Sequence, residues 1–149
     1  MIQIEKAIFD ENTTEQLIQL SKKWVEEDIC FGMAANEVTD LKEPCFLAKV
    51  EGQIVGYIFG HFYTQENKLS GIETGSNCFD VDECYVLPKY RSLGIGRMLF
   101  DAIQKEVKEK ASYITLVTST KDFRRILSFY VDDIGMTFHD AFLFKKLED

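Results

Sequence analysis

Apolar and polar residues follow two periods along this chain, and the period separates predicted helices from predicted strands. Apolar side chains recur every three or four residues, as on one face of a helix, in 14–25, 94–110 and 122–131. A weaker pattern of the same kind covers 25–38. Short apolar runs bounded by glycine, proline or polar residues are typical of strands. Such runs occur at 2–9, 45–50, 54–63, 78–86, 113–118 and 141–147, and a further short strand fits at 136–138.

The order of these elements indicates how they pair. Glu51-Gly52-Gln53 is a short connection between two apolar runs, which is typical of an antiparallel hairpin. The helix at 94–110 lies between two predicted strands and is long enough to carry the chain to a parallel neighbour. The polar, glycine-containing segment 64–77 is expected to be a loop. We therefore expect an α/β (α+β) fold, with a mixed, mostly antiparallel sheet of six to seven strands flanked by about four helices.

Length and composition favour a single domain that spans 1–149. A chain of 149 residues is the size of one compact domain, and 46% hydrophobic residues, among them 12 phenylalanines, suffice for a core. No apolar run is long enough to cross a membrane. Acidic residues occur within the first dozen positions, unlike a secretory signal or a transit peptide, so we expect a cytoplasmic protein.

The formal net charge of −8 narrows the class of partner. An acidic protein repels a phosphate backbone, so non-specific nucleic-acid binding is disfavoured. A cationic substrate such as an amine would be attracted. An acidic surface also keeps a protein soluble, and the charge alone does not distinguish these two explanations.

The cysteines and histidines predict no metal site. Zinc sites need closely spaced Cys and His ligands, and this chain has no C-x-x-C pair and only two histidines. Reduced, packed thiols are the expected state of the cysteines in a cytoplasmic protein. The histidines are expected in the core or on the surface. These residues are Cys30, Cys45, Cys78, Cys84, His61 and His139.

One segment combines a strand end, a proline and two glycines at the start of a predicted helix. It reads YVLPKYRSLGIG over 85–96. The first N–H groups of a helix have no partner within it, and the helix dipole favours an anion there. Gly94 and Gly96 let a phosphate approach the backbone closely, and Arg91 adds a cationic donor. The pattern is neither the triphosphate-binding G-x-x-x-x-G-K-S/T nor the dinucleotide-binding G-x-G-x-x-G.

The pattern Val86-x-Pro88-x-x-Arg91-x-x-Gly94-x-Gly96 resembles the GNAT superfamily of N-acetyltransferases. The order of the other predicted elements also matches that family over nearly the whole chain. The resemblance implies that backbone amides of the turn hold the pyrophosphate of acetyl-coenzyme A. It also implies that the main chain of the preceding strand pairs with the pantetheine arm. The implied cofactor-binding residues are Tyr85, Val86, Arg91, Ser92, Leu93, Gly94, Ile95 and Gly96.

Glu83 is the candidate general base. An ammonium group must lose a proton before it can attack a thioester. Strand alternation places Glu83 on one apolar face with Val81 and Tyr85, where burial would raise the pKa of its carboxyl group. Asp80 and Asp82, on the other face, are weaker candidates. Many members of the family use a glutamate on this strand, often through water. A buried salt bridge or hydrogen bond is the alternative role, and a bulge would change the alternation.

Tyr130 is the candidate general acid. The family commonly has a tyrosine at this place whose hydroxyl protonates the departing coenzyme A thiolate. Two features differ from the family. The spacing from Tyr130 to Gly135 is one residue longer than usual, and Phe123 replaces an asparagine that often contacts the coenzyme. The alternative role of Tyr130 is an apolar one, in a stripe with Phe123 and Leu127.

The resemblance and these residues predict an acetyl-coenzyme A-dependent N-acetyltransferase in which a primary amine attacks directly. The acceptor is an unidentified small molecule or peptide. A non-catalytic acyl-coenzyme A sensor of the same fold is the alternative, and an O-acyltransferase or a longer acyl donor also remains open. Segments 25–43 and 64–77, which carry many carboxylates, are expected to flank the acceptor. Many relatives are dimers, so a homodimer is a further expectation.

Overall fold

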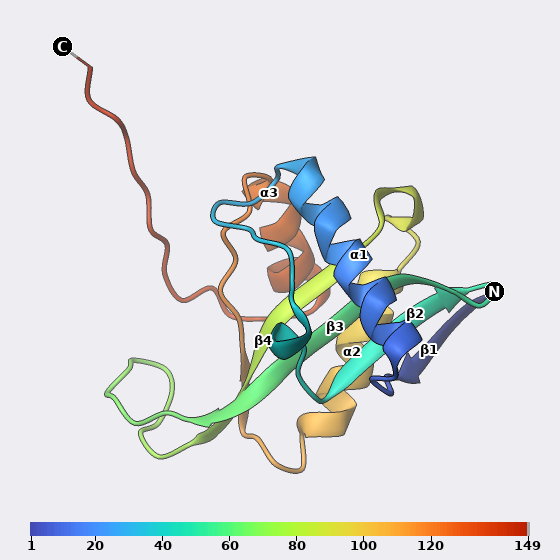
Figure 1. Cartoon of the computed structure of the whole chain (residues 1–149). Helices are drawn as coiled ribbons and strands as arrows, with labels where there is room; N and C mark the ends of the chain where they lie inside the picture. The colour runs from blue at the N-terminus through green and yellow to red at the C-terminus, as the bar shows by residue number, and fades with distance from the viewer. Residues whose placement is uncertain (149) are drawn as a thin grey trace.

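A mixed sheet of five strands runs through the computed structural model, which describes residues 1–148 (Figure 1). The strands lie in the sheet in their order along the chain, from β1 at one edge to β5 at the other. The first three pairings are antiparallel, and β4 pairs with β5 in parallel. The strands are β1 (Ile2–Lys6), β2 (Cys45–Val50), β3 (Gln53–Thr64), β4 (Asn77–Val86) and β5 (Tyr113–Thr115).

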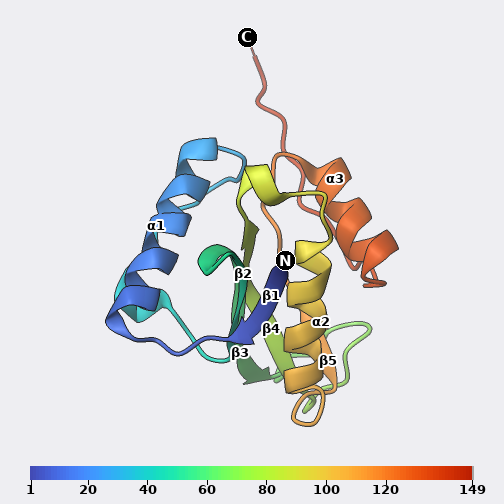
Figure 2. The same cartoon turned by 90° about the vertical axis from the view of Figure 1, so that its right-hand side faces the viewer.

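Helices cover both faces of this sheet, with α1 on one face and α2 on the other (Figure 2). The first helix begins after Asp10, whose carboxylate accepts a hydrogen bond of 2.7 Å from the Thr13 amide. No helix within residues 1–148 has the length and apolar character needed to cross a bilayer. The helices are α1 (Glu11–Glu27), α2 (Ile95–Val107) and α3 (Phe123–Leu127), with 3-10 turns at Val38–Asp40 and Pro88–Tyr90 and a π-helical turn at Ser128–Asp133.

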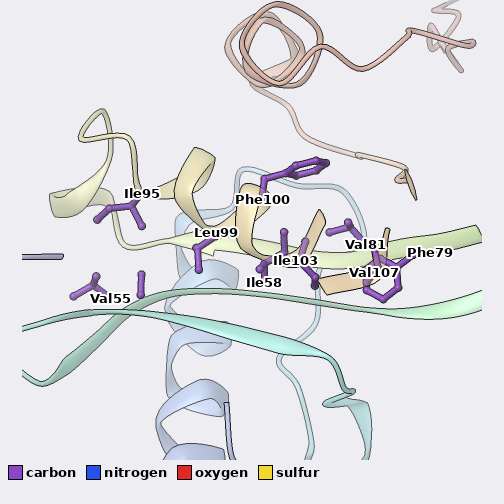
Figure 3. Close-up of a cluster of buried hydrophobic side chains, with 10 residues drawn as sticks. Val55, Ile58, Phe79, Val81, Ile95, Leu99, Phe100, Ile103 and Val107 are labelled. Atoms are coloured by element: carbon purple, nitrogen blue, oxygen red, sulfur yellow. The ribbon is translucent and has the colours of Figure 1, made fainter. Parts of the chain in front are cut away.

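Two apolar cores hold these layers together. Between α2 and the sheet, Leu99, Phe100 and Ile103 pack against strand residues that include Ile58 and Phe79, and all five are fully buried (Figure 3). The core on the α1 face combines leucines of α1 with aromatic side chains of β3 and β4. Burial of each such side chain contributes about 1.5–3 kcal/mol. The sheet is therefore held firmly between its helices, and side chains on its strands have fixed positions.

A bulge at Asp82 divides β4 into two parts. Glu83 and Val81 lie opposite consecutive residues of β3, which leaves Asp82 without a partner residue. An extra residue of this kind reverses the alternation of side chains beyond it. Val81 packs in the α2-side core, whereas Glu83 faces Tyr57 on the α1 side. The predicted common face of Val81 and Glu83 is therefore wrong, although Glu83 and Tyr85 do share a face.

The last two strands pair over only three residues. Cys78 to Asp80 of β4 pair with Tyr113 to Thr115 of β5, and beyond this point the two segments separate. Residues 81–86 and 116–120 then both line a cavity. Because the chain enters α2 soon after β4, the N-terminal end of α2 also reaches this gap. The predicted crossover between parallel strands is confirmed, and it positions the candidate site.

The helix predicted over 122–131 changes from α-helical to π-helical at Ser128. The amide of Ile134 donates a hydrogen bond to the carbonyl of Phe129, five residues earlier, at 2.9 Å. A π-helical turn accommodates one extra residue in a helix. It therefore accounts for the additional residue after Tyr130.

Three predicted elements are not formed. The helix α1 ends at Glu27, so most of 25–38 is a loop. The segments 136–138 and 141–147 have no helical or strand structure, because no neighbouring strand satisfies their backbone N–H and C=O groups within residues 1–148. The five strands and three α-helices of the described chain are thus fewer than predicted. The other predicted elements, including the hairpin and the loop at 64–77, are confirmed with ends that differ by a few residues.

Candidate active site

A cavity of about 830 Å³ occupies the gap between β4 and the chain after β5. The loop 29–34 after α1, the start of α2, and α3 with its π-helical turn complete its lining. This volume is typical of a site for a small molecule or cofactor. Glu83 and Tyr130 both line the cavity, as do all of the predicted cofactor-binding residues except Leu93.

The turn before α2 presents backbone amides to this cavity. Gly94 caps the helix with a φ of 83°, a left-handed conformation that glycine adopts without strain. The first hydrogen bond of the helix joins the Met98 amide to the Gly94 carbonyl at 3.0 Å. The amides of Ile95 to Arg97 therefore precede the helical ladder. Amides in this position, together with the helix dipole, favour an anion.

The side chains of this turn have different roles. Ile95 is buried in the α2-side core and anchors the turn, so only its backbone is available to a ligand. Leu93 is exposed and lies outside the cavity lining. A Cβ atom on Gly96 would lie 3.2 Å from the ring of Phe129. Gly96 therefore permits close packing of α2 against the π-helical turn, in addition to leaving its backbone open.

The Arg91 side chain is held by α1 rather than free beside the turn. Its guanidinium contacts the two oxygens of Glu27 at 2.8 and 2.9 Å, and its Nε donates to the Val86 carbonyl at 2.8 Å. The Tyr85 hydroxyl also donates to Glu27, and Trp24 stacks on the Tyr85 ring. The charge of Arg91 is thus already paired. This geometry makes Arg91 a brace between α1 and the turn, which differs from the free phosphate ligand expected from the sequence.

Arg97 and Arg125 are cavity-lining cations that the sequence did not single out. The Nε atoms lie 3.9 Å from Asp101 and 2.6 Å from Asp122, and both arginine side chains are more than half exposed. Exposed ion pairs of this kind are weak, so these guanidinium groups can turn toward an anion. Arg97 could have been identified from the sequence, because it lies in the first turn of the predicted helix. No sequence spacing relates Arg125 to that turn. Phe123 lies outside the cavity lining.

Glu83 is the centre of a hydrogen-bonded cluster on the α1 side. Its Oε1 accepts hydrogen bonds from the Tyr57 hydroxyl at 2.7 Å and from the Asn36 side-chain amide at 2.9 Å. The backbone amide of Asn36 donates to Ser21 Oγ at 2.9 Å, which ties the loop after α1 to that helix. Oε2 accepts no hydrogen bond within residues 1–148, so it is free to accept a proton. Asn36 and Tyr57 come from other elements, and no sequence spacing pointed to them.

Burial raises the pKa of the Glu83 carboxyl group above its ordinary value. The hydrogen bonds from Tyr57 and Asn36 stabilise the carboxylate and oppose this increase, whereas the nearby charge of Asp82 adds to it. Glu83 is consequently more basic than a solvated glutamate. The direction of this change suits a group that must accept a proton.

Tyr130 approaches β4 from the opposite side. Its ring packs against the α2-side core, with its centroid 6.2 Å from that of Phe100, and its hydroxyl interacts with the Cys84 thiol. Burial, and to a lesser extent Cys84, raises the pKa of Tyr130 well above its ordinary value. The hydroxyl therefore keeps its proton and can donate a hydrogen bond. Glu83 and Cys84 are consecutive in β4, so the candidate base and acid lie on opposite faces of one strand.

The thiols that line the cavity are not activated. Burial raises the pKa of Cys84 to about 12, and burial is also the main cause of the raised pKa of Cys30. The thiolate is the nucleophilic form of cysteine, and almost none is present at neutral pH when the pKa is so high. Neither cysteine has the environment of a covalent nucleophile.

His61, Asp80 and Asp82 come together on β3 and β4, with possible ligand atoms within 4.8 Å of one another. His61 Nδ1 lies 2.9 Å from Asp82 Oδ2, and the Lys42 ammonium lies 3.4 Å from the same oxygen. Asp80 accepts a hydrogen bond of 2.8 Å from the Thr115 hydroxyl. Protein groups thus already compensate these carboxylates, and we assign no metal to them.

Comparison with known proteins places this geometry in a family. The model of the acetyltransferase (GNAT) family matches residues 6–136. An N-alpha-acetyltransferase of Sulfurisphaera tokodaii is 28% identical over 95 residues, which are 64% of this chain and only 57% of that relative. The structure of aminoglycoside N-acetyltransferase AAC(6')-Iy in complex with CoA aligns with a TM-score of 0.68 at 17% identity, over 99% of this chain and 100% of the other. A ribosomal-protein-alanine N-acetyltransferase from Brucella melitensis aligns with a TM-score of 0.65 at 17% identity, over 98% and 99% of the two chains. These two solved structures share the fold of this chain. Because the family model covers most of the chain, the chain belongs to the GNAT acetyltransferase family.

Proposed function

We propose that this protein transfers the acetyl group of acetyl-coenzyme A to a primary amine of a small molecule or peptide. The observation that carries the proposal is the gap beside β4, which reaches the amide-bearing turn of α2 and is lined by both Glu83 and Tyr130. Such a gap accepts an extended arm with a phosphate group at one end. With the phosphate at the turn, the arm would run along β4 toward Glu83.

The residues of the turn fit the pyrophosphate of coenzyme A in charge and shape. The backbone amides of the turn, together with the amides of Ile95 to Arg97 that precede the helical ladder, would bind the phosphate oxygens. Arg97 and Arg125 would add positive charge from two sides. Bound acetyl-coenzyme A supplies an acetyl group activated as a thioester. In this proposal Arg91 fixes the position of the turn through Glu27 rather than binding the phosphate itself.

Glu83 would act as the general base for the acceptor amine. Tyr57 and Asn36 hold Oε1, so the carboxylate has one orientation, and Oε2 remains for the ammonium proton or for a water molecule that carries it. Burial makes this oxygen a better proton acceptor than that of a solvated glutamate. Proton transfer by a positioned side chain contributes about 10²- to 10⁴-fold in rate.

Tyr130 would stabilise the departing thiolate from the other face of β4. Because its pKa is raised, complete proton transfer to a thiolate is unfavourable, so the hydroxyl acts first as a hydrogen-bond donor. The unreactive thiol of Cys84 supports direct attack by the amine, since an acyl-enzyme would need a nucleophile at this place.

The acceptor would enter beside the loop after α1. Of the two segments expected to flank it, residues 29–34 line the cavity, whereas 64–77 do not. The net charge of −8 favours a cationic acceptor. Relatives of similar structure act on aminoglycosides or on a ribosomal-protein alanine, as their names state. An amine of either a small molecule or a peptide is therefore the proposed class.

The proposal is tested by calorimetric titration with acetyl-coenzyme A, together with a thiol-release assay against amines of both classes. We expect binding, and thiol release with one class of amine. Binding without release for every amine would favour the alternative of a non-catalytic acyl-coenzyme A sensor. The absence of binding would overturn the assignment of the turn.

Two glycines provide a matched pair of variants for this titration. Gly94 in the turn and Gly75 in the loop at 64–77 have φ of 83° and 92°, and a Cβ atom on either would meet nothing within 4 Å. Alanine at either position introduces the same left-handed strain, roughly 1–2 kcal/mol. We expect Gly94→Ala to weaken acetyl-coenzyme A binding and Gly75→Ala to leave it unchanged. Equal effects of both substitutions would mean that the turn has no special role.

A further inference from the structure

Asp82 is a second carboxylate beside the candidate base, and the acetyl transfer described above gives it no direct role. It directly precedes Glu83 in β4, and it also lines the cavity. As the bulge residue it has no partner residue in β3, and its side chain is only 23% exposed. Consecutive Cα atoms lie about 3.8 Å apart, so a molecule that reaches Glu83 also comes close to Asp82.

The His61 ring holds the Asp82 carboxylate from the neighbouring strand β3. Its Nδ1 atom lies 2.9 and 3.0 Å from the two carboxylate oxygens. An ionised carboxylate only accepts hydrogen bonds, so the imidazole donates from Nδ1. A carboxylate can accept about four such bonds. The contact with His61 therefore fixes the orientation of Asp82 and leaves room for a further donor.

The further donor in this structure is an ammonium group. The Lys42 Nζ atom lies 3.4 Å from Asp82 Oδ2, and the Lys42 side chain is 47% exposed. An ion pair of this length and exposure is weak, so a competing ammonium can replace Lys42 at little cost. Lys42 also belongs to the segment 25–43, which the sequence predicts beside the acceptor. Lys42 thus shows which kind of group the Asp82 carboxylate accepts.

Asp82 differs from the other aspartates of this region in its access to the cavity. Burial raises the pKa of the Glu83 carboxyl group, and the charges of Asp82 and Asp40 add to this increase. The carboxylates of Asp40 and Asp80 each accept a hydrogen bond of 2.8 Å from a protein group, and both residues lie outside the cavity lining. An acceptor in the cavity would therefore meet Asp82 rather than Asp40 or Asp80.

We propose that Asp82 binds a second ammonium group of the acceptor, so that a diamine or polyamine is preferred over a monoamine. This inference rests on the proposed acetyl transfer. The reacting amine lies at Glu83, and the second ammonium replaces Lys42 at Asp82. The chemistry is unchanged: the N–C bond of the amide forms, the C–S bond of the thioester breaks, and Glu83 takes the ammonium proton. Asp82 acts through its charge and determines specificity.

Pairs of acceptors that differ by one ammonium group test this preference. The thiol-release assay compares 1,3-diaminopropane with propylamine, and 1,5-diaminopentane with pentylamine. For at least one pair we expect kcat/KM to be about tenfold higher for the diamine, mainly through KM, as for a charged hydrogen bond at a partly exposed site. Thiol release with equal kcat/KM within both pairs would overturn the subsite alone. The absence of release with every amine, peptides included, would overturn the proposed function and the subsite with it.

Two aspartates of β4 provide matched variants. Asp82→Asn should remove most of the preference for the diamine and leave acetyl-coenzyme A affinity unchanged by calorimetry. Asp80→Asn removes the same charge outside the cavity lining and should retain the preference. The ratio of diamine to monoamine is the readout, because loss of the Asp82 charge also lowers the pKa of Glu83 and affects both acceptors equally. Equal losses in the two variants would indicate a general effect of charge and overturn the subsite.

Lys42→Gln should produce a gain that a purely structural role of Asp82 would not give. Removal of the competing ammonium should lower KM for the preferred diamine by about two- to fivefold, and by less for its monoamine. In an Asp82→Asn background the same substitution should have no effect. Lys49→Gln, at an ion pair with Glu5, is the control. Calorimetric titration of the diamine into protein saturated with coenzyme A should give the same order of affinities. An unchanged or higher KM in Lys42→Gln would overturn the exchange of ammonium groups.

Discussion

The two faces of the sheet differ in chemistry, although both are covered by a helix and both are well packed. The core under α2 consists of aliphatic and phenylalanine side chains, with Leu99 and Phe79 fully buried. The core under α1 contains polar groups that are bonded to one another, centred on Glu83 and on the Glu27–Arg91 pair. Buried polar groups are tolerated only when their hydrogen bonds are satisfied. The difference teaches that the α2 face mainly stabilises the fold, whereas the α1 face holds charged groups in position beside the cavity.

The largest expected effect is on turnover, from the substitution Glu83→Gln. Glutamine can still accept the hydrogen bonds from Tyr57 and Asn36 but cannot take a proton from an ammonium group. We expect kcat to fall by about 10²- to 10⁴-fold, with little change in acetyl-coenzyme A affinity by calorimetry. Unchanged turnover between about pH 6 and 9 would remove Glu83 from the role of base.

The stability of Glu83→Gln relative to the wild type should increase as the pH rises. The folded-state pKa of Glu83 is raised, so the folded protein holds this proton more tightly than the unfolded chain does. The wild type is therefore favoured below the ordinary carboxyl pKa and loses this contribution as the pH rises through the folded-state value. Thermal melting of Glu83→Gln and wild type should show a difference in favour of the variant that grows with pH. A difference that shrinks would contradict the raised pKa.

A substitution on the α2 face is expected to lower the stability of the fold rather than kcat. Leu99→Ala removes a fully buried side chain from a core whose buried members are all apolar. The expected decrease in the free energy of unfolding is about 2–5 kcal/mol, measured by urea denaturation. Met98→Ala, at a partly exposed neighbour, should cost much less. The pH dependence of the remaining activity should not move, and a displaced pH profile would mean that the two faces are coupled.

Tyr130→Phe tests the one group on the α2 side to which we assign a catalytic role, the Tyr130 hydroxyl. The ring and its packing against Phe100 are retained, and only the hydroxyl is lost. The expected decrease in kcat is about 10- to 10³-fold, with an unchanged unfolding midpoint. Full activity in this variant would mean that Tyr130 only packs in the core. The α2 face would then contribute to stability alone.

The smallest expected effect is a displacement of the pH profile by Tyr57→Phe. The Tyr57 hydroxyl stabilises the charged form of Glu83, so its removal raises the pKa of Glu83 further. The acidic limb of the kcat/KM profile should move to higher pH, by up to about one unit. Tyr63→Phe, the same change on the same strand but bonded to Thr115, is the control. A limb that stays in place or moves to lower pH would exclude Tyr57 as a group that positions Glu83.

The sequence predicted the elements whose signals are local. The hairpin, the strand that contains Glu83 and the glycine turn before α2 each follow from a short run of residues, and the structure has all three. The predictions of strands at 136–138 and 141–147 are wrong, because a strand needs a neighbouring strand that the same run of residues does not specify. The pairing of Arg91 with Glu27 and of Glu83 with Asn36 joins positions far apart in the chain. Periodicity carries no information on such contacts.

The bulge at Asp82 has a consequence for how relatives of this chain should be compared. If the same residues paired with β3 without the bulge, every side chain after Asp82 in β4 would change face, so that Cys84 would face α1 and Glu83 would enter the aliphatic layer. Two aligned sequences could therefore share every letter around the glutamate and still present different groups to an acceptor. The pairing register of β4 with β3, and not the local sequence alone, therefore decides which side chains of β4 face α1.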